Sequence, residues 1–348
     1  MNKKLVALAV AAAFAAPVAM AELTLYGKVH ADITLNDDGN NDEWSVNSPG
    51  SRLGFKGQTD LGNGMKAMFK YETTYDGLDN STDTLGSPRN SYVGLSGKKG
   101  TLILGRHDTP AKMAFYAAGN DHLGDSIIDF NKIDKGYQFD LDGDGNFKNG
   151  DEYDTGEQPR SAGFTEKREV NSILYVSPGM SGFKIAAAGM PGESTANKGD
   201  ALIDSYSVGL MYKGKGIQFG AGFENMAGAA DSKMTQVGAS YTFKNMTLGA
   251  QFENTKNYDN IADRSKEVMG VSAKAVFGKN ALIANYSMQD SEGGALPNVE
   301  SKNIGLAVKH TLSKRTNFYL AFNKQESDLS VGNDTESDNI ALGMMHSF

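Results

Sequence analysis

The sequence predicts an all-β fold, a sixteen-stranded antiparallel transmembrane β-barrel. Apolar and polar residues alternate with a period of two through most of the chain, as in strands with one apolar face. The predicted connections alternate between short turns and long polar loops, which is typical of such barrels. Beyond the N-terminus there is no run of about 18 apolar residues that could form a membrane-spanning helix.

The composition excludes several classes of function. The 348 residues include 34 basic and 42 acidic ones, for a net charge of −8. This balance argues against nucleic acid as a partner, because phosphate binding requires a basic surface. With Cys 0, disulfides, thiolate metal sites and cysteine nucleophiles are excluded. The motifs G-x-S-x-G, H-E-x-x-H and the P-loop are absent, so we predict no enzyme and no catalytic residues.

The first 21 residues have the pattern of a secretory signal peptide. Lys3 and Lys4 form a positive start, 5–17 is apolar, and Ala19-Met20-Ala21 is a small-x-small cleavage site. The alternative is a buried N-terminal helix. We therefore expect 1–21 to be removed and the barrel to comprise 22–348.

The strands follow from the alternation, segment by segment. In 246–254, for example, Met246, Leu248, Ala250 and Phe252 share one face, while the other face is polar or Gly. The predicted strands lie near 23–35, 51–60, 65–75, 90–97, 101–106, 169–176, 183–190, 205–213, 217–225, 234–243, 246–254, 267–277, 281–289, 300–312, 316–326 and 338–348.

The connections between these strands differ in length. Gly and Asn, which suit the positive φ angles of tight hairpins, occur in the short ones, such as 61–64, 214–216 and 278–280. Longer polar connections, such as 36–50 and 76–89, alternate with them. The strands of a soluble β-sandwich or propeller also alternate. Such a fold buries its apolar face, however, and sixteen strands at this spacing should then show larger side chains. The final strand ends on Phe348, which suits the aromatic girdle of a barrel rim.

Several short segments carry a resemblance to a known family. They are LTLYGKV at 23–29, SRLGFKG at 51–57, DLGNGMKA at 60–67, RNSYVGL at 89–95, LGR at 104–106 and the terminal Phe348. In order and spacing the chain resembles the trimeric, sixteen-stranded general porins of the Gram-negative outer membrane, of neisserial and related proteobacterial type. The resemblance covers nearly the whole mature chain.

The longest connection runs from about residue 107 to 168. A loop of this length in a compact domain is usually functional. The resemblance implies that this third loop folds into the barrel and narrows the pore; the alternative is a disordered external excursion.

The predicted lumen is lined by charges on the face opposite the apolar one. Alternation places Lys56 and Lys70 there. The resemblance implies constriction arginines at Arg52 and Arg89, with Arg106 as a third, although alternation puts Arg106 on the apolar face. The candidate acidic partners in the third loop are Asp108, Asp121, Asp125 and Asp129. Basic wall charges facing loop carboxylates would create a transverse field across the constriction. The alternative for any one of them is an ordinary solvated charge.

Residues 140–151 have the spacing of a calcium loop. Asp140, Asp142 and Asp144 occupy positions 1, 3 and 5, Gly145 follows at position 6, and Asp151 is at position 12. Asn146 would add a further oxygen ligand. Because no amphipathic helices flank the motif, an EF-hand proper is excluded, and the alternative is an acidic, solvated loop. No cofactor is required, but Ca²⁺ is a candidate ligand.

Taken with the resemblance, these features predict an outer-membrane channel. It would pass ions and small hydrophilic solutes by passive diffusion, contact outer-membrane lipid and form a homotrimer. Two alternatives stay open, namely a substrate-specific channel and a barrel that only anchors an adhesin or an enzyme.

Overall fold

The structure is a computed structural model that describes residues 22–37, 42–75, 77–78, 85–132, 137–140, 157–160, 163–192, 201–294, 296–330 and 334–348. In these ranges no helix is both long and apolar enough to cross a membrane.

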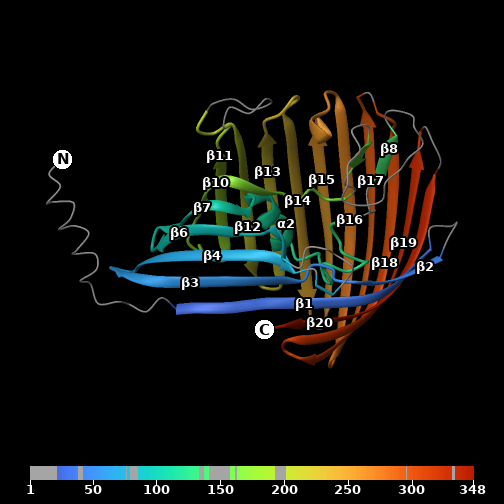
Figure 1. Ribbon diagram of the computed structural model, residues 1–348, viewed down its shortest axis with the longest axis horizontal. Coiled ribbons are helices and arrows are strands. Elements are labelled where there is room, and N and C mark those ends of the chain that lie inside the picture. Colours follow the sequence, from blue (N-terminus) through green and yellow to red (C-terminus); the bar gives the residue numbers. More distant parts are fainter. Residues whose placement is uncertain are drawn as a thin grey trace.

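Sixteen antiparallel strands form a closed barrel, as the sequence predicts. They are β1 (Glu22–Asp37), β3 (Arg52–Gly62), β4 (Met65–Tyr75), β6 (Ser91–Gly97), β7 (Gly100–Asp108), β10 (Arg168–Val176), β11 (Phe183–Met190), β12 (Ser205–Gly214), β13 (Ile217–Met226), β14 (Ser232–Phe243), β15 (Met246–Lys256), β16 (Arg264–Phe277), β17 (Asn280–Gly293), β18 (Val299–Ser313), β19 (Thr316–Leu329) and β20 (Thr335–Ser347). Each strand pairs with its neighbours in this series, and β1 closes the barrel by pairing with β20 (Figure 1).

The two faces of each strand differ sharply in polarity and exposure. In β14, the inward Gln236 is 1% exposed, whereas the adjacent outward Val237 is 42% exposed. Outward leucines are similarly exposed, with Leu248 at 57% and Leu342 at 56%. Each such side chain would cost about 1.5–3 kcal/mol relative to burial if it faced water. This apolar outer face therefore requires lipid, and closure leaves no unpaired strand edge within it.

Tight turns join the strands at one end of the barrel. Asn63, Lys215 and Lys244 have φ angles of 54°, 51° and 53°. These left-handed conformations are those that two-residue hairpin turns require, and their twist matches that of the flanking strands.

Short elements fall in regions that the sequence analysis left as loops. β2 (Asp42–Asn47) pairs with the end of β1, and β5 (Leu85–Pro88) pairs with β4. The assignment of 36–50 and 76–89 to loops was therefore wrong in part. Within 107–168 lie α2 (Pro110–Ala117), β8 (Tyr137–Asp140) and β9 (Glu157–Arg160), and the 3-10 helix η1 (Tyr258–Asn260) follows β15.

Helix α2 lies against the inner face of β12 and β13. The side chain of Thr109 caps the helix by accepting from the Lys112 amide at 3.3 Å, and Pro110 occupies the first turn. Inward glycines allow the close approach, because a Cβ at Gly220 would lie 1.8 Å from the carbonyl oxygen of Ala114. The glycines of this wall therefore form the surface on which the helix packs.

The seam between the two ends of the chain is tied by a buried polar cluster. The Tyr319 hydroxyl donates to Asp32 at 2.9 Å and lies 2.8 Å from Nε2 of His30. All three side chains are at most 4% exposed. The amide of Phe348 also donates to the carbonyl of Gly27 at 3.1 Å. The cluster and this terminal bond join the first strand to the last two.

Candidate functional site

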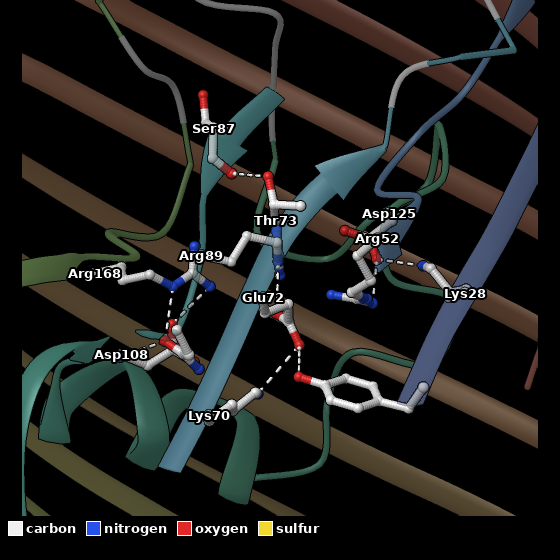
Figure 2. A network of polar contacts seen from close by, with 12 residues as sticks. Lys28, Arg52, Lys70, Glu72, Thr73, Ser87, Arg89, Asp108, Asp125 and Arg168 are labelled. Carbon is white, nitrogen blue, oxygen red and sulfur yellow. Dashed lines mark hydrogen bonds and ion pairs between the residues drawn. The ribbon is translucent and has the colours of Figure 1, made fainter. Parts of the chain in front are cut away.

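Two cations on the inner wall converge on one carboxylate of the segment 109–132. Lys28 of β1 and Arg52 of β3 are register partners. The Lys28 Nζ lies 2.5 Å and the Arg52 Nη2 3.0 Å from Oδ2 of Asp125 (Figure 2). Burial raises the pKa of Asp125, but these two cations outweigh it and hold the pKa below its usual value. Asp125 is therefore ionised at neutral pH.

Glu72 of β4 is the second centre of the wall network. It accepts from the Arg89 Nε at 2.9 Å and from the Tyr26 hydroxyl at 2.8 Å, and the Lys70 Nζ lies 3.1 Å away. The Arg89 amide also donates to the Glu72 carbonyl at 2.7 Å. Because the carboxylate accepts several donors, it fixes these side chains in one arrangement. Figure 2 shows this group beside the Lys28–Arg52 pair.

Asp108, at the end of β7, links the start of the long connection 107–168 to its end. Arg168 Nη2 lies 2.8 Å from its carboxylate (Figure 2). Lys112 Nζ lies 3.6 Å from the same carboxylate, and the Asn90 amide, just before β6, donates to it at 2.8 Å. These contacts join β6, α2 and β10, so the entry and exit of the long connection are held together.

The return of the connection is anchored on the opposite side of the barrel. Glu253 accepts from the Thr165 amide at 2.7 Å and from its hydroxyl at 2.6 Å, and pairs with Lys266 Nζ at 3.0 Å. Glu253 and Lys266 are fully buried. Next to them, the ring of Phe164 stacks on that of Phe130, with centroids 5.4 Å apart. The connection therefore contacts walls on both sides of the lumen.

Two further carboxyl groups of the segment lie among acids. Burial raises the pKa of Asp121 well above its usual value, and Asp129 and Glu166 add to this effect. Burial likewise raises the pKa of Asp129 to about 6, with Lys132 opposing the shift. Both groups therefore hold a proton more readily than an ordinary aspartic acid does.

The structure brings together five of the eight predicted constriction residues: Arg52, Arg89, Lys70, Asp108 and Asp125. Lys56 is the register partner of Lys70, and its Nζ lies 5.2 Å from the ring centroid of Tyr26. Asp121 forms no ion pair in the described part of the chain.

Arg106 stands apart from this network. It shares the outward parity of Leu102 and Leu104, and no ion pair in the described ranges involves it. The structure therefore does not bring the third predicted arginine to the network.

Other members of the network were not among the predicted constriction residues. They are Lys28, Tyr26, Glu72, Asn90, Lys112 and Arg168. For Lys28 and Glu72 the signal was present, because alternation alone places both on the inner face. Arg168 and Lys112 could not be found this way, since their positions depend on the path of the long connection.

The predicted calcium ligands fall almost wholly outside the described residues. The backbone of Asp140 ends β8, while Asp142, Asp144, Asn146 and Asp151 lie beyond the ranges that the structure describes. Among the described residues, no group of three or more His, Asp or Glu side chains could hold a metal ion.

A closed barrel with an apolar outer face and a charged inner face defines a membrane channel. The chain belongs to the Gram-negative porin family, whose family model matches residues 7–330. It is 29% identical over 351 residues to outer membrane porin protein 32 of Delftia acidovorans, covering 95% of this chain and 92% of that protein. It is also 30% identical over 228 residues to major outer membrane protein P.IB of Neisseria gonorrhoeae, covering 62% of this chain and 55% of that protein.

Solved structures show the same fold at low sequence identity. The anion-selective porin from Comamonas acidovorans matches with a TM-score of 0.71 at 22% identity, over 94% of this chain and 100% of that chain. OmpF of Salmonella typhi, in complex with daunomycin, matches with a TM-score of 0.64 at 15% identity, over 94% and 97%. The protein is thus a porin of the Gram-negative outer membrane, a channel for passive diffusion.

Proposed function

We propose that the segment 109–132 narrows the lumen and that Lys28, Arg52 and Arg89 make the channel prefer anions. The observation that carries this proposal is the contact of Lys28 and Arg52 with Asp125, which places wall cations directly against the segment. Basic groups on one side of a narrow passage and carboxylates on the other create a field across it, so charge as well as size selects the solutes. One structural neighbour, the anion-selective porin from Comamonas acidovorans, supports the same preference.

A planar-bilayer recording tests this proposal. With a KCl gradient across the membrane, the reversal potential should have the sign of chloride permeation. A reversal potential of the opposite sign would contradict the anion preference. Saturable flux of a single solute would instead favour the substrate-specific channel, and the absence of any current would favour a barrel that only anchors an adhesin or an enzyme.

We also propose that the protein forms a homotrimer and conducts solutes without catalysing a reaction. The trimer is supported by a structural neighbour, OmpT of Vibrio cholerae, which was solved in a trimer form. Chemical cross-linking in outer membranes should give a band at three times the monomer mass, and boiling before cross-linking should abolish it. A band series that stops at the monomer would contradict the trimer.

Calcium binding by Asp140, Asp142, Asp144, Asn146 and Asp151 remains a proposal from the sequence. Oxygen ligands at alternate positions around a glycine suit Ca²⁺, and unpaired carboxylates so close together repel one another. A bound cation would relieve that repulsion and order the loop.

A further inference from the structure

The part of the wall formed by β16 to β18 carries two lysines with no carboxylate partner in the described ranges. Lys274 of β16 shares the inward face with the buried Ser272 and Lys266, and Lys309 of β18 shares it with the buried Asn303 and Ala307. Both lysines are half-buried. Within the described ranges neither forms an ion pair or a hydrogen bond, whereas Lys28 and Arg52 are both paired.

The strand register places the two lysines near each other. Lys274 lies opposite Ile283 of β17, which in turn lies opposite Ala307 of β18, two residues before Lys309. The two positions are therefore separated by about 10 Å across the sheet and about 7 Å along it. Long, flexible ammonium side chains on one concave face can converge over such a separation.

The third loop contributes polar groups to the same region. Nε2 of His122 lies 3.4 Å from the Ser272 hydroxyl, which also lies 3.4 Å from the side-chain oxygen of Asn120. Burial and, to a smaller extent, the nearby charges of Lys274 and Lys309 lower the pKa of His122 to about 4. His122 is therefore neutral at pH 7, so its ring carries one N–H donor.

No anionic group of the described chain balances the two ammonium charges. Asp121 lies within electrostatic range of Lys309 but forms no ion pair with it. Two half-buried cations facing one another cost free energy through desolvation and mutual repulsion. An anion with two negative charges would relieve both, while a monovalent ion could balance only one.

We propose that Lys274 and Lys309, together with His122 and Ser272, form a binding site for small divalent oxyanions on the wall formed by β16 to β18. The ligand class comprises tetrahedral phosphate and short dicarboxylates, which share the double charge. Each ammonium would pair with one charged end of the ligand, and the Ser272 hydroxyl and the His122 N–H would donate to the remaining oxygens. The site rests on the proposed anion-conducting function, and it would bind such a solute transiently during its passage through the channel.

The test is the block of chloride current by dianions in planar bilayers at pH 8, where inorganic phosphate is mostly the dianion. In the wild-type channel, phosphate in one arm and succinate in the other should lower the chloride current in a saturable way, and acetate should not. The variant Lys274→Gln/Lys309→Gln should raise the half-blocking concentration by about tenfold, the loss expected when charged hydrogen bonds are removed. Of phosphate and succinate, the anion with the lower half-blocking concentration is the preferred ligand.

The matched control removes two other inward lysines. Lys66→Gln/Lys184→Gln removes the same net charge from exposed positions of β4 and β11 and should leave the block unchanged. Equal block in the wild type and in Lys274→Gln/Lys309→Gln, or equal block by acetate, would overturn the site. A wild-type channel that passes no chloride would instead overturn the proposed function, so the two failures are distinguishable.

Discussion

Two parts of the lumen wall use the same residue types in different ways. On the β1–β3–β4 wall, each of Lys28, Arg52, Lys70 and Arg89 contacts a carboxylate, and Asp125 belongs to the segment 109–132. On the β16–β18 wall, Lys274 and Lys309 face the same segment without any carboxylate contact. The contacts of Lys28 and Arg52 with Asp125 hold the segment in place and offset part of their charge, whereas no ion pair offsets the charge of the two lysines.

This difference shows that the number of charged residues along a pore does not by itself determine the electrostatic potential in its lumen. A cation in a short ion pair contributes a local dipole, whereas an unpaired cation contributes a full charge to the potential of the lumen. The segment 109–132 decides which wall is paired, because it carries Asp125 to one side and His122 toward the other. Changing the segment should therefore change the two walls differently.

Deleting residues 121–157 should have the largest effect, because it removes the facing groups of both walls. We expect the single-channel conductance to rise by on the order of twofold, since the narrowest part of the lumen is widened. Single-channel recording measures this, and heat-modifiable migration in gels checks that the barrel has folded. If a folded variant keeps the wild-type conductance, the segment does not narrow the pore.

The substitution Asp125→Asn should make the paired wall resemble the unpaired one. Lys28 and Arg52 would lose their shared carboxylate, and their charge would become available to the lumen. The ratio of anion to cation permeability, measured from reversal potentials, should rise about threefold. Asp60→Asn is the matched control, because that carboxylate accepts only from the Gly62 amide at an exposed turn. A shift no larger than that of the control would contradict the role of Asp125.

Lowering the pH should change the two sides of the segment unequally. Asp129, whose raised pKa is about 6, takes up a proton between pH 7.5 and 5, so the segment becomes less negative. Asp125 stays ionised over this window, because its pKa lies below the usual value. Anion preference should therefore increase as the pH falls, and Asp129→Asn should flatten the change. A pH response in that variant equal to that of the wild type would argue against Asp129.

Calcium should have the smallest effect on the two groups of wall cations, because the motif at 140–151 lies outside the segment 109–132. If the motif at 140–151 binds Ca²⁺, with a dissociation constant on the order of 10⁻⁴–10⁻³ M, millimolar Ca²⁺ should slow proteolysis within residues 107–168. The variant Asp142→Ala/Asp144→Ala should lose this protection. Protection that survives the variant, or that magnesium gives equally, would leave only an acidic loop screened by cations.

The barrel was predictable from sequence because its rule is local. Period-2 alternation determines which face of each strand meets lipid, so the positions of Lys28, Arg52 and Glu72 on the inner face follow directly from it. Alternation and the family pattern disagreed on Arg106, and no ion pair in the described ranges brings this arginine to the network. β2 and β5 were missed because they are only 6 and 4 residues long; β5 shows no alternation, and β2 alternates only through Trp44 and Val46.

The pairing across the lumen was not predictable, because it depends on contacts far apart in the sequence. Asp108, Asp121, Asp125 and Asp129 are chemically equivalent in the sequence, yet only Asp125 meets Lys28 and Arg52. The choice depends on how α2 packs on glycines such as Gly220 and on how Glu253 holds the returning chain. These constraints come from strands that follow the loop in the chain, so the loop sequence alone does not contain them.

The seam has a consequence for how the protein is made. The last strand is the partner of the first, and the Tyr319 cluster joins the same two ends of the chain. Until β20 arrives, β1 keeps an unpaired edge, which hydrocarbon does not tolerate and which invites pairing with other chains. Pairing between residues so distant in sequence is also slow, because the loop-closure entropy must be overcome first. A nascent chain that lacks its final strand is therefore an aggregation hazard, and completion of the whole polypeptide is the step that commits it to the membrane.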